Sequence, residues 1–435
     1  MADQKQPPQL FEQLLFPRLF QAFRLAIQPS KLVIALLGLT VICLAGQAMD
    51  LSRTVVVAPP AEEIGSELDV YMTSPSPHQA VLEFRRQYQA KGLRTGVFST
   101  LWSFGSQKFH AALRELFDLK FTGVARNIVD YFKALGWAFR YHYAYCLVFA
   151  VIKLAVIAVV GGAVCRMAAL QLARGEKPGP IQALRFSVKR FTSLLFAPLL
   201  PVAILVVLGV PIGLVGLAGN IPWAGELIVG IFSPLVLALG LCMAVALVGA
   251  VAGFNLMFPA VAYDGLDAFD AIGSSFSYVF NRPWRMAFYT ALAAVYGAVC
   301  YIVVRFFAFL LILVAHTTLS LCLWKENPSG VNKLSAIWPE PRFMNLLGLE
   351  SAAPASWTES VAAVVVYGSL WVVAAAVVSV VITFYFSANT IIYSLLRHKV
   401  DNAALDDVYI ESRDLESRPA AATSLLSSQA PNNCR

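Results

Sequence analysis

Long apolar runs separated by short polar segments dominate the hydropathy pattern of this chain. Six runs are long enough to cross a membrane as helices, and they lie at residues 32–49, 143–165, 192–218, 224–259, 286–324 and 361–396. A helix rises about 1.5 Å per residue, so roughly 20 apolar residues cross a hydrocarbon core of about 30 Å. The pattern therefore predicts an all-α fold, a polytopic transmembrane helical bundle of about six spans with amphipathic interfacial helices.

The fifth run, Met286–Trp324, is long enough to hold two spans. Arg305 interrupts it, but no turn-forming residue stands nearby. An extra crossing would also move Arg397 and Lys399 to the outer side, against the rule that basic residues stay inside. We prefer one helix that starts at the inner face, reaches the outer face near Arg305 and continues along the outer surface. The two-span alternative stays open.

Polar segments divide the chain into regions. Residues 1–31 form a cytoplasmic leader, in which apolar residues recur every three or four positions as in a surface-lying amphipathic helix. Residues 50–142 form an extracytoplasmic region, and the mixture of aromatic residues and single charges in its second part indicates interfacial helices. Residues 143–399 form a five-span bundle. Residues 400–435 are acidic and then rich in Ser and Ala, and are expected to be a disordered cytoplasmic tail.

One basic loop sets the predicted orientation. Between the second and third runs it carries a single acid, Glu176, and six cations, Arg166, Arg174, Lys177, Arg185, Lys189 and Arg190. Short membrane loops rich in Lys and Arg stay on the cytoplasmic side. The chain is therefore expected to lie in the cell inner membrane with both termini in the cytoplasm.

Composition points to lipid as the main partner. Hydrophobic residues make up 58% of the 435 residues and charged residues only 14%, which is more apolar surface than a soluble core needs. The net charge of +7 comes from residues clustered where spans meet the cytoplasm, so it does not predict a nucleic-acid partner. Membrane-protein partners fit this composition as well, and the oligomeric state is left open.

Catalytic chemistry has little support in the sequence. No nucleophile elbow, phosphate-binding glycine loop, HExxH motif or CxxC pair occurs, so we expect no enzyme, no cofactor and no metal site. Asp264, Asp267 and Asp270 recur every third residue and are a weak exception. They are compatible with a cation site, but capping of the helix that follows is the better interpretation, because a carboxylate satisfies free N–H groups there.

Ionisable side chains inside membrane spans are functional candidates by default, because their burial is expensive. Lys153 is the strongest, since it lies deep in the second run with no acid in helical reach. Its alternative role is snorkelling of the ammonium group toward the interface. Arg305 is expected at the outer interface. His316 is a candidate for a proton-linked site, and its alternative is an ordinary hydrogen-bonded polar residue.

A weak internal repeat runs through the chain. Three stretches starting at Gln21, Gln182 and Asp270 each lead into an outward-going run. Two positions align among them, and they hold Ala22, Ala183 and Ala271, followed four residues later by Ala26, Ser187 and Ser275. A true repeat predicts three parallel hairpins, each fed by a cytoplasmic amphipathic helix. Alternatively, membrane-entry helices look alike because they obey the same constraints.

One segment resembles a known type of membrane domain. It runs from Gly253 to about Tyr289 and begins GFNLMFPAVAYDGLDAFDAIGSSFSYVFNRPWRM. Its span, acidic turn and Ala-containing helix resemble the membrane domain attached to some glycerophosphodiester phosphodiesterases. Elsewhere, FRLAIQPSKLVIALLG, GGAVCRMAALQLARGEK and IIYSLLRHKVDNAALDDVYIE are similar to uncharacterised multi-pass proteins of planctomycete-type bacteria. The resemblance implies an inner-membrane location and no activity, because the phosphodiesterase catalytic domain has no counterpart in the sequence.

Two functional hypotheses follow. The leading one is a non-enzymatic scaffold, assembly or membrane-organising factor, which the many amphipathic segments and the lack of a polar path favour. The alternative is a small-solute transporter or channel, which Lys153, the proline-broken spans and the repeat favour.

Overall fold

The structure is a computed structural model that describes residues 16–58, 65–88, 92–323, 325, 332–347 and 356–410. Its helical elements are η1 (Phe16–Phe20), α1 (Gln21–Ala26), α2 (Pro29–Asp50), α3 (Glu67–Thr73), α4 (Pro77–Tyr88), α5 (Val97–Phe117), α6 (Phe121–Tyr141), α7 (Tyr143–Arg174), α8 (Pro180–Lys189), α9 (Phe191–Phe196), α10 (Leu200–Ala218), α11 (Gly225–Asp264), α12 (Ala268–Asn281), α13 (Pro283–Cys322), α14 (Lys333–Ile337) and α15 (Trp357–Val400). Six of them, α2, α7, α10, α11, α13 and α15, are long and apolar enough to span a membrane. The predicted all-α polytopic bundle is confirmed.

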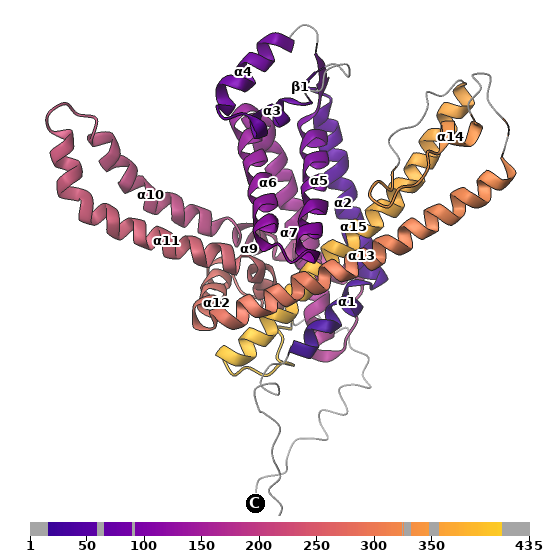
Figure 1. Cartoon of the computed structure of the whole chain (residues 1–435). Coiled ribbons are helices and arrows are strands. Elements are labelled where there is room, and N and C mark those ends of the chain that lie inside the picture. Colours follow the sequence, from indigo (N-terminus) through magenta and orange to yellow (C-terminus); the bar gives the residue numbers. More distant parts are fainter. Residues whose placement is uncertain are drawn as a thin grey trace, which may run out of the picture.

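Three of the spans are much longer than a bilayer needs. Helices α11 and α13 have 40 residues each and α15 has 44. At about 1.5 Å per residue, 40 residues measure about 60 Å, twice the roughly 30 Å hydrocarbon core. Helix α13 continues without a break through Arg305, so the fifth run is one helix, as preferred from the sequence. Figure 1 shows α11 and α13 strongly inclined to α2 and α7.

Proline and glycine mark several helix ends. Proline occupies the first turn of α2, α8 and α13, where the missing N–H has no partner to lose. Gly175 and Gly265 end α7 and α11 with φ of 70° and 67°, a left-handed conformation that side chains disfavour. The spans on the predicted cytoplasmic side therefore stop where the chain must turn into α8 and α12.

The spans pack together at one end into a single core, here called the junction. It is built from continuous buried stretches of α7 (161–170), α11 (256–263) and α15 (386–396), with α1, α8 and α12 around them. A Cβ added at Gly161 would lie 2.6 Å from the Phe386 ring, and one at Gly162 2.4 Å from Leu194. Small residues thus let the helices approach closely, as membrane helix packing requires.

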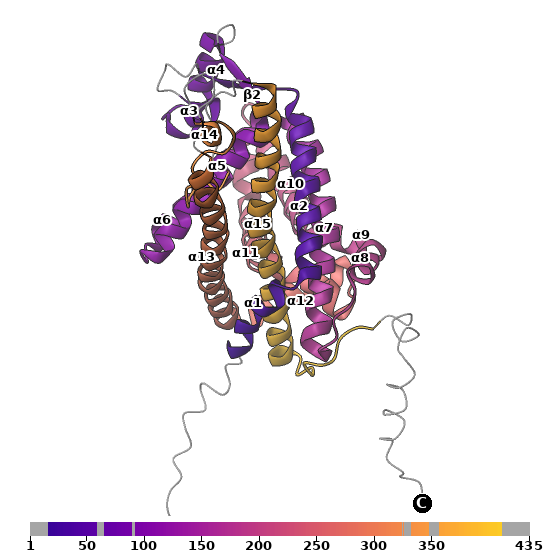
Figure 2. The same ribbon diagram turned by 90° about the vertical axis from the view of Figure 1, so that its right-hand side faces the viewer.

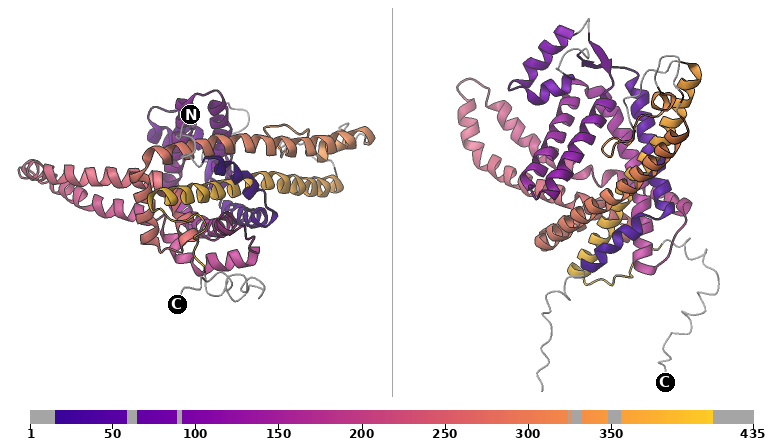
Figure 3. Two further views of the ribbon diagram at one scale, coloured as in Figure 1. Left: turned by 90° about the horizontal axis from the view of Figure 1, so that it is seen from below. Right: turned by 45° about the vertical axis from the view of Figure 1, so that its right-hand side comes forward.

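Away from the junction, the long spans diverge into two arms. The α10–α11 arm extends to one side and the α13–α15 arm to the other, with α2, α5, α6 and α7 as a column between them (Figures 1 and 3). In the most apolar windows of α10 and α11 only 6% of residues are buried, against 33% for α13. Seen from below, the molecule is therefore elongated along the line that joins the two arms (Figure 3).

The region between α2 and α7 folds back on the column. Strands β1 (Val55–Val57) and β2 (Leu93–Thr95) pair antiparallel, and α3 and α4 lie beside them. Asp50 at the end of α2 accepts hydrogen bonds from the backbone N–H groups of Phe98 and Ser99, at 2.9 and 2.8 Å, and so caps α5. Helices α5 and α6 form an amphipathic hairpin that leans toward the α13 side (Figure 2), and Lys108 and Asp130 join its two helices at 2.8 Å.

The C-terminal end differs from its prediction. Residues 401–410, called the strap, lie against the junction, where Tyr409 N–H donates to the Tyr263 carbonyl at 2.9 Å. Val408 is only 4% exposed. The expectation of disorder from residue 400 is wrong for these ten residues, because their contacts come from helices far away in sequence. Residues 411–435 and 1–15 lie outside the described residues.

The repeated stretches occupy equivalent places in the fold. They form α1, α8 and α12, which precede α2, α10 and α13. All six aligned small residues are buried: Ala22, Ala26, Ala183, Ser187, Ala271 and Ser275. The predicted order of a short helix followed by a span is present three times, and the aligned positions are buried at the junction.

Candidate functional site

Lys153 lies away from every buried site. It is exposed on α7, on the same outward surface as Leu147 and Val151, which are 64% and 62% exposed. A lysine on a lipid-facing surface can extend its ammonium group toward the interface along its own stem. This placement fits the snorkelling alternative, and Lys153 lines neither of the two cavities described below.

Arg305 is buried within the α13–α15 arm. Its guanidinium donates to the carbonyls of Phe343 and Met344 at 2.9 and 2.8 Å and to the Tyr301 hydroxyl at 2.6 Å. Only 8% of the residue is exposed. Residues 343–344 therefore cover the charge with protein, whereas the sequence placed it at the outer interface.

His316 is also buried within the α13–α15 arm, further along α13 than Arg305. Its Nε2 lies 3.3 Å from the Trp338 carbonyl oxygen, and its ring meets the Trp338 ring edge-on. No acid among the described residues is hydrogen-bonded to it. The contact fits the ordinary polar role and joins α13 to the end of α14.

Lys31 is the intramembrane lysine that sequence reasoning missed. It is fully buried, and its Nζ donates to the Leu25 carbonyl at 3.1 Å and to Gln171 Oε1 at 3.3 Å. It is the last residue of the predicted leader and stands at the edge of an apolar run, so the sequence did not mark it as a buried charge. Its position links the end of α1 to α7 inside the junction.

Arg166 and the strap close the junction. The Arg166 guanidinium donates to the carbonyls of Ala262 and Tyr409, at 3.1 and 2.8 Å, and stacks 4.6 Å from the centre of the Phe186 ring. Tyr409 also packs on Gly265, where an added Cβ would lie 2.6 Å from the ring. One buried arginine thus joins α7, α8, α11 and the strap.

The three loop aspartates do not converge on a cation site. Asp264 pairs with Arg397 at 3.1 Å and accepts a hydrogen bond from the Tyr393 hydroxyl at 2.5 Å. Asp267 pairs with Arg190 at 3.6 Å. Asp267 does stand at the N-cap of α12, but its side chain makes no capping hydrogen bond. Within the described ranges, no group of three metal-binding side chains occurs.

Another buried charge lies in the region between α2 and α7. Glu67 is fully buried, and its Oε1 accepts hydrogen bonds from Arg85 at 2.7 Å and from Trp137 Nε1 at 3.2 Å. His142 Nε2 lies 3.3 Å from Arg85. Burial, and then the nearby Arg85 charge, lower the pKa of His142 to about 4. His142 is therefore neutral at pH 7 and accepts from the guanidinium.

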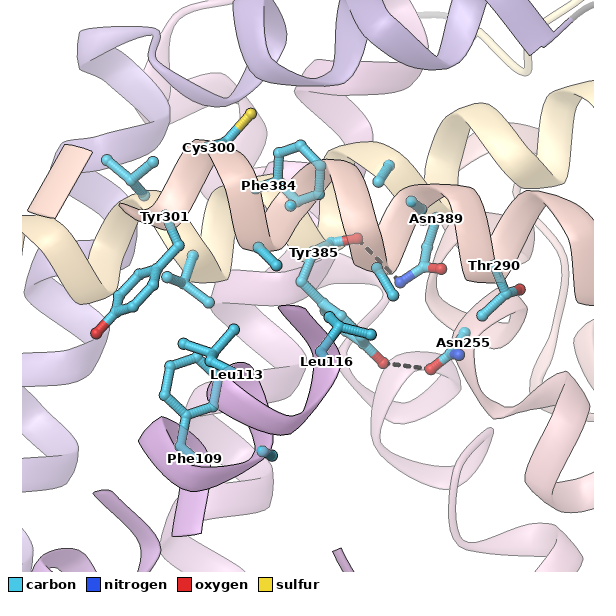
Figure 4. A pocket seen from close by; sticks show the side chains of 18 of the residues that line it. Phe109, Leu113, Leu116, Asn255, Thr290, Cys300, Tyr301, Phe384, Tyr385 and Asn389 are labelled. Atoms are coloured by element: carbon cyan, nitrogen blue, oxygen red, sulfur yellow. Dashed lines mark hydrogen bonds between the residues drawn. The ribbon is translucent and has the colours of Figure 1, made fainter. Parts of the chain in front are cut away.

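A mostly apolar cavity lies between the α5–α6 hairpin and the long spans. A cavity of about 340 Å³ is bounded by α5, α11, α13 and α15 (Figure 4). Leu113, Leu116, Ala293, Gly297 and Phe384 form much of its apolar wall. A second cavity of about 470 Å³ adjoins it along α5, and Phe109, Ala112, Tyr301 and Val381 line both.

The cavity of about 340 Å³ is here called the lower cavity and that of about 470 Å³ the upper cavity. Uncharged polar side chains gather at one end of the lower cavity. Asn255 from α11, Thr290 from α13 and Asn389 from α15 meet there (Figure 4). The Tyr385 hydroxyl donates to Asn255 Oδ1 at 2.5 Å, and Asn389 Nδ2 donates to the Tyr385 carbonyl at 2.9 Å. Sequence reasoning missed this cluster, although amides within long apolar runs were a visible signal.

The wall chemistry favours binding over catalysis. The lower cavity is lined by amides, hydroxyls and apolar groups, with no acid or base positioned to move a proton. The upper cavity is lined by Lys108, His110 and Arg305, but Lys108 pairs with Asp130 and Arg305 is bonded to backbone carbonyls. The arrangement can hold an apolar ligand that carries a neutral hydrogen-bonding group.

Comparison with known proteins adds no family. No protein-family model, no curated protein and no solved structure matches this chain. The local resemblance to the phosphodiesterase-linked membrane domain and to planctomycete-type membrane proteins therefore stays a prediction.

Proposed function

We propose that this chain is a non-enzymatic inner-membrane protein that organises the bilayer around it. Both termini lie in the cytoplasm, so the junction sits in the inner leaflet and the arms diverge toward the outer leaflet. The observation that carries the proposal is this shape: spans packed tightly at one end and splayed at the other (Figure 1).

The physical basis is the difference in cross-section between the two leaflets. Exposed apolar helix displaces lipid, and the α10–α11 arm is almost wholly exposed. More lipid is therefore displaced on the arm side than on the junction side. A protein of this shape is most stable where the extracytoplasmic leaflet is expanded, on the outside of a curved membrane.

The test is curvature sorting of the reconstituted full chain. Fluorescent protein in giant vesicles, with its extracytoplasmic side outward, should concentrate in membrane tubes pulled from the vesicle. Molecules inserted in the opposite orientation should be depleted from the same tubes. Equal density in tubes and flat membrane for both orientations would reject the proposal.

Spin labels at the arm tips test the shape directly. Labels at Asn220, in the α10–α11 turn, and at Thr358, at the outer end of α15, should remain widely separated in the bilayer. The substitution Arg166→Ala should broaden this distance distribution and weaken the sorting, whereas Arg174→Ala, an exposed arginine on the same helix, should change neither. A short tip-to-tip distance with a narrow distribution in lipid would contradict the proposed shape, in which the spans pack at the junction and diverge into the arms.

The transporter alternative has less support from the described residues. Lys153 faces outward, while Arg305 and His316 bond to backbone carbonyls rather than line a continuous polar path. Solute-dependent flux in proteoliposomes that disappears in Lys153→Ala would favour the transporter over the organising role.

A further inference from the structure

We propose that the cavity under the α5–α6 hairpin binds one bilayer glycerolipid, with an acyl chain along the apolar wall and an ester group at Asn255, Thr290 and Asn389. The proposal goes beyond the organising role, because it assigns a specific ligand site. It rests on the size of the cavity, the absence of charge on its wall, the unpaired polar atoms at its end and the depth of that end.

The space has the size and shape of a chain-binding site. The two adjoining cavities measure about 340 and 470 Å³, within the roughly 300–1,000 Å³ typical of ligand pockets. They share Phe109 and Tyr301 as a common wall and follow α5 along its length. An extended acyl chain can run from the uncharged lower cavity along α5 into the upper cavity, where Lys108 and Arg305 are already bonded to protein groups.

The wall selects a neutral polar group. No Asp, Glu, Lys or Arg lines the lower cavity. A phosphate or free carboxylate placed there would be a buried charge without a partner, which is strongly unfavourable. Ester and hydroxyl groups carry no net charge and form hydrogen bonds, so the glycerol-ester part of a lipid is compatible with this wall.

Hydrogen-bonding capacity is left over where that group would lie. Asn389 is only 6% exposed, and beyond the bond from its Nδ2 to the Tyr385 carbonyl its Oδ1 has no partner among the described residues. Asn255 Oδ1 accepts from Tyr385, while the Asn255 Nδ2 donors have no partner in the same part of the chain. Donor and acceptor therefore face one space. An ester carbonyl can accept a hydrogen bond from Asn255 Nδ2, and a hydroxyl can donate one to Asn389 Oδ1.

The depth of the polar end indicates the source of the ligand. Asn255, Thr290 and Asn389 lie about two to three helical turns from the junction ends of α11, α13 and α15. Because these helices are inclined, this distance places the three residues near the inner edge of the hydrocarbon core, where glycerol esters lie. Tyr385 beside them is 39% exposed, so the site is open to surrounding lipid.

A photoreactive glycerolipid with a diazirine on one acyl chain tests the proposal in proteoliposomes of the full chain. Peptide mapping should place the label on α5 residues 109–116 and α13 residues 293–301, above the level on the lipid-exposed α10. Ala112 lines both cavities, so Ala112→Phe should lower this label by about tenfold, the effect of losing roughly two buried methylene groups. Ala111→Phe, at the preceding residue of the same helix and outside both cavities, should leave the labelling unchanged.

The polar end has its own test. A photoreactive fatty acid with the same chain but an ionised carboxylate should label the cavity about tenfold less than the glycerolipid, because its charge has no partner there. Asn389→Leu should reduce this preference for the ester, while monodisperse elution and unchanged helicity show that the variant folds. Equal labelling by both lipids, or undiminished labelling of folded Ala112→Phe, would overturn the proposal. Curvature sorting is a separate measurement, so either proposal can fail without the other.

Discussion

The two arms of the molecule differ in how far other parts of the protein cover them. The α10–α11 arm, here called the bare arm, is covered by almost no other part of the protein. Glu226, near its tip, is its only charged residue outside the junction. The α13–α15 arm carries Arg305 and His316 within its length, and residues 338–344 fold back to bond both side chains. Apolar helices need only lipid around them, but a charge at this position needs a protein shell.

The difference shows what fixes each arm in place. The bare arm is held only at the junction, where α11 is buried from 256 to 263. The α13–α15 arm, here called the braced arm, is held at the junction and again along its length. The polar contacts of Arg305 and the α5–α6 hairpin, together called the brace, provide this second attachment. Damage to the junction should therefore affect both arms, whereas damage to the brace should affect one.

The largest effect is expected at the junction. Arg166→Ala removes the donor to Ala262 and Tyr409 and the stacking on Phe186. The two buried carbonyls then lack a donor and a cavity replaces the guanidinium, so the free energy of unfolding should fall by about 3–5 kcal/mol. The apparent melting temperature in detergent should fall and proteolysis should release the strap, while Arg174→Ala should leave both unchanged. A normal melting temperature for Arg166→Ala would show that the junction does not hold the arms.

An intermediate effect is expected at the brace. Arg305→Leu leaves the Phe343 and Met344 carbonyls without their donor and should cost about 2–4 kcal/mol. Hydrogen exchange should increase in residues 338–347 and along outer α13, with little change in α10–α11. The exposed Arg282→Ala on the loop before α13 is the control. Increased exchange that spreads equally into both arms would contradict the separation between brace and junction.

Acid should loosen the column and spare both arms. His142 has a folded pKa of about 4, below its ordinary value of 6.5, so the unfolded state binds the extra proton first. Stability is therefore complete above about pH 6.5 and is lost as the pH falls toward 4, by about 1–2 kcal/mol after allowance for solvent screening. Hydrogen exchange of residues 67–88 should rise over this range, and His142→Gln should remove the dependence between pH 6.5 and 5. The same pH change should leave exchange in α10–α11 and α13 unaltered.

The smallest effect is expected on the bare arm. Leu237 in α11 is 74% exposed, so Leu237→Ala should change stability by no more than about 0.5 kcal/mol. Ile312 in α13 is 3% exposed, and the matched change Ile312→Ala should cost about 2–5 kcal/mol because it leaves a cavity. Melting temperatures of the two variants in one detergent give the comparison. Similar losses for both would show that the α10–α11 arm is covered in the intact molecule.

The spans were predictable from sequence because hydropathy reports burial in lipid or protein alike. Rotation about a helix axis is harder to infer. Lys153 ranked first because it lies deep in a run, yet it faces outward, while Lys31 at the edge of a run is fully buried. In an evenly apolar helix no amphipathic pattern distinguishes the packed face from the lipid face.

The polar contacts could not be predicted because their partners are distant in sequence. Arg305 bonds to residues 38 and 39 positions away, and Asn255 to Tyr385 at a separation of 130. The strap was expected to be disordered because its composition is polar, but composition does not report that Tyr409 fits against Gly265. Only the two amides, Asn255 and Asn389, within long apolar runs gave a signal for the cavity.

The bond between Arg166 and Tyr409 also constrains how the protein is made. The two residues are 243 positions apart, so the arginine is synthesised long before its acceptor exists. At bacterial or eukaryotic elongation rates of about 5–20 residues per second, that interval lasts roughly 12–50 s. During biogenesis the junction can therefore close completely only after the last helix and the strap have been delivered.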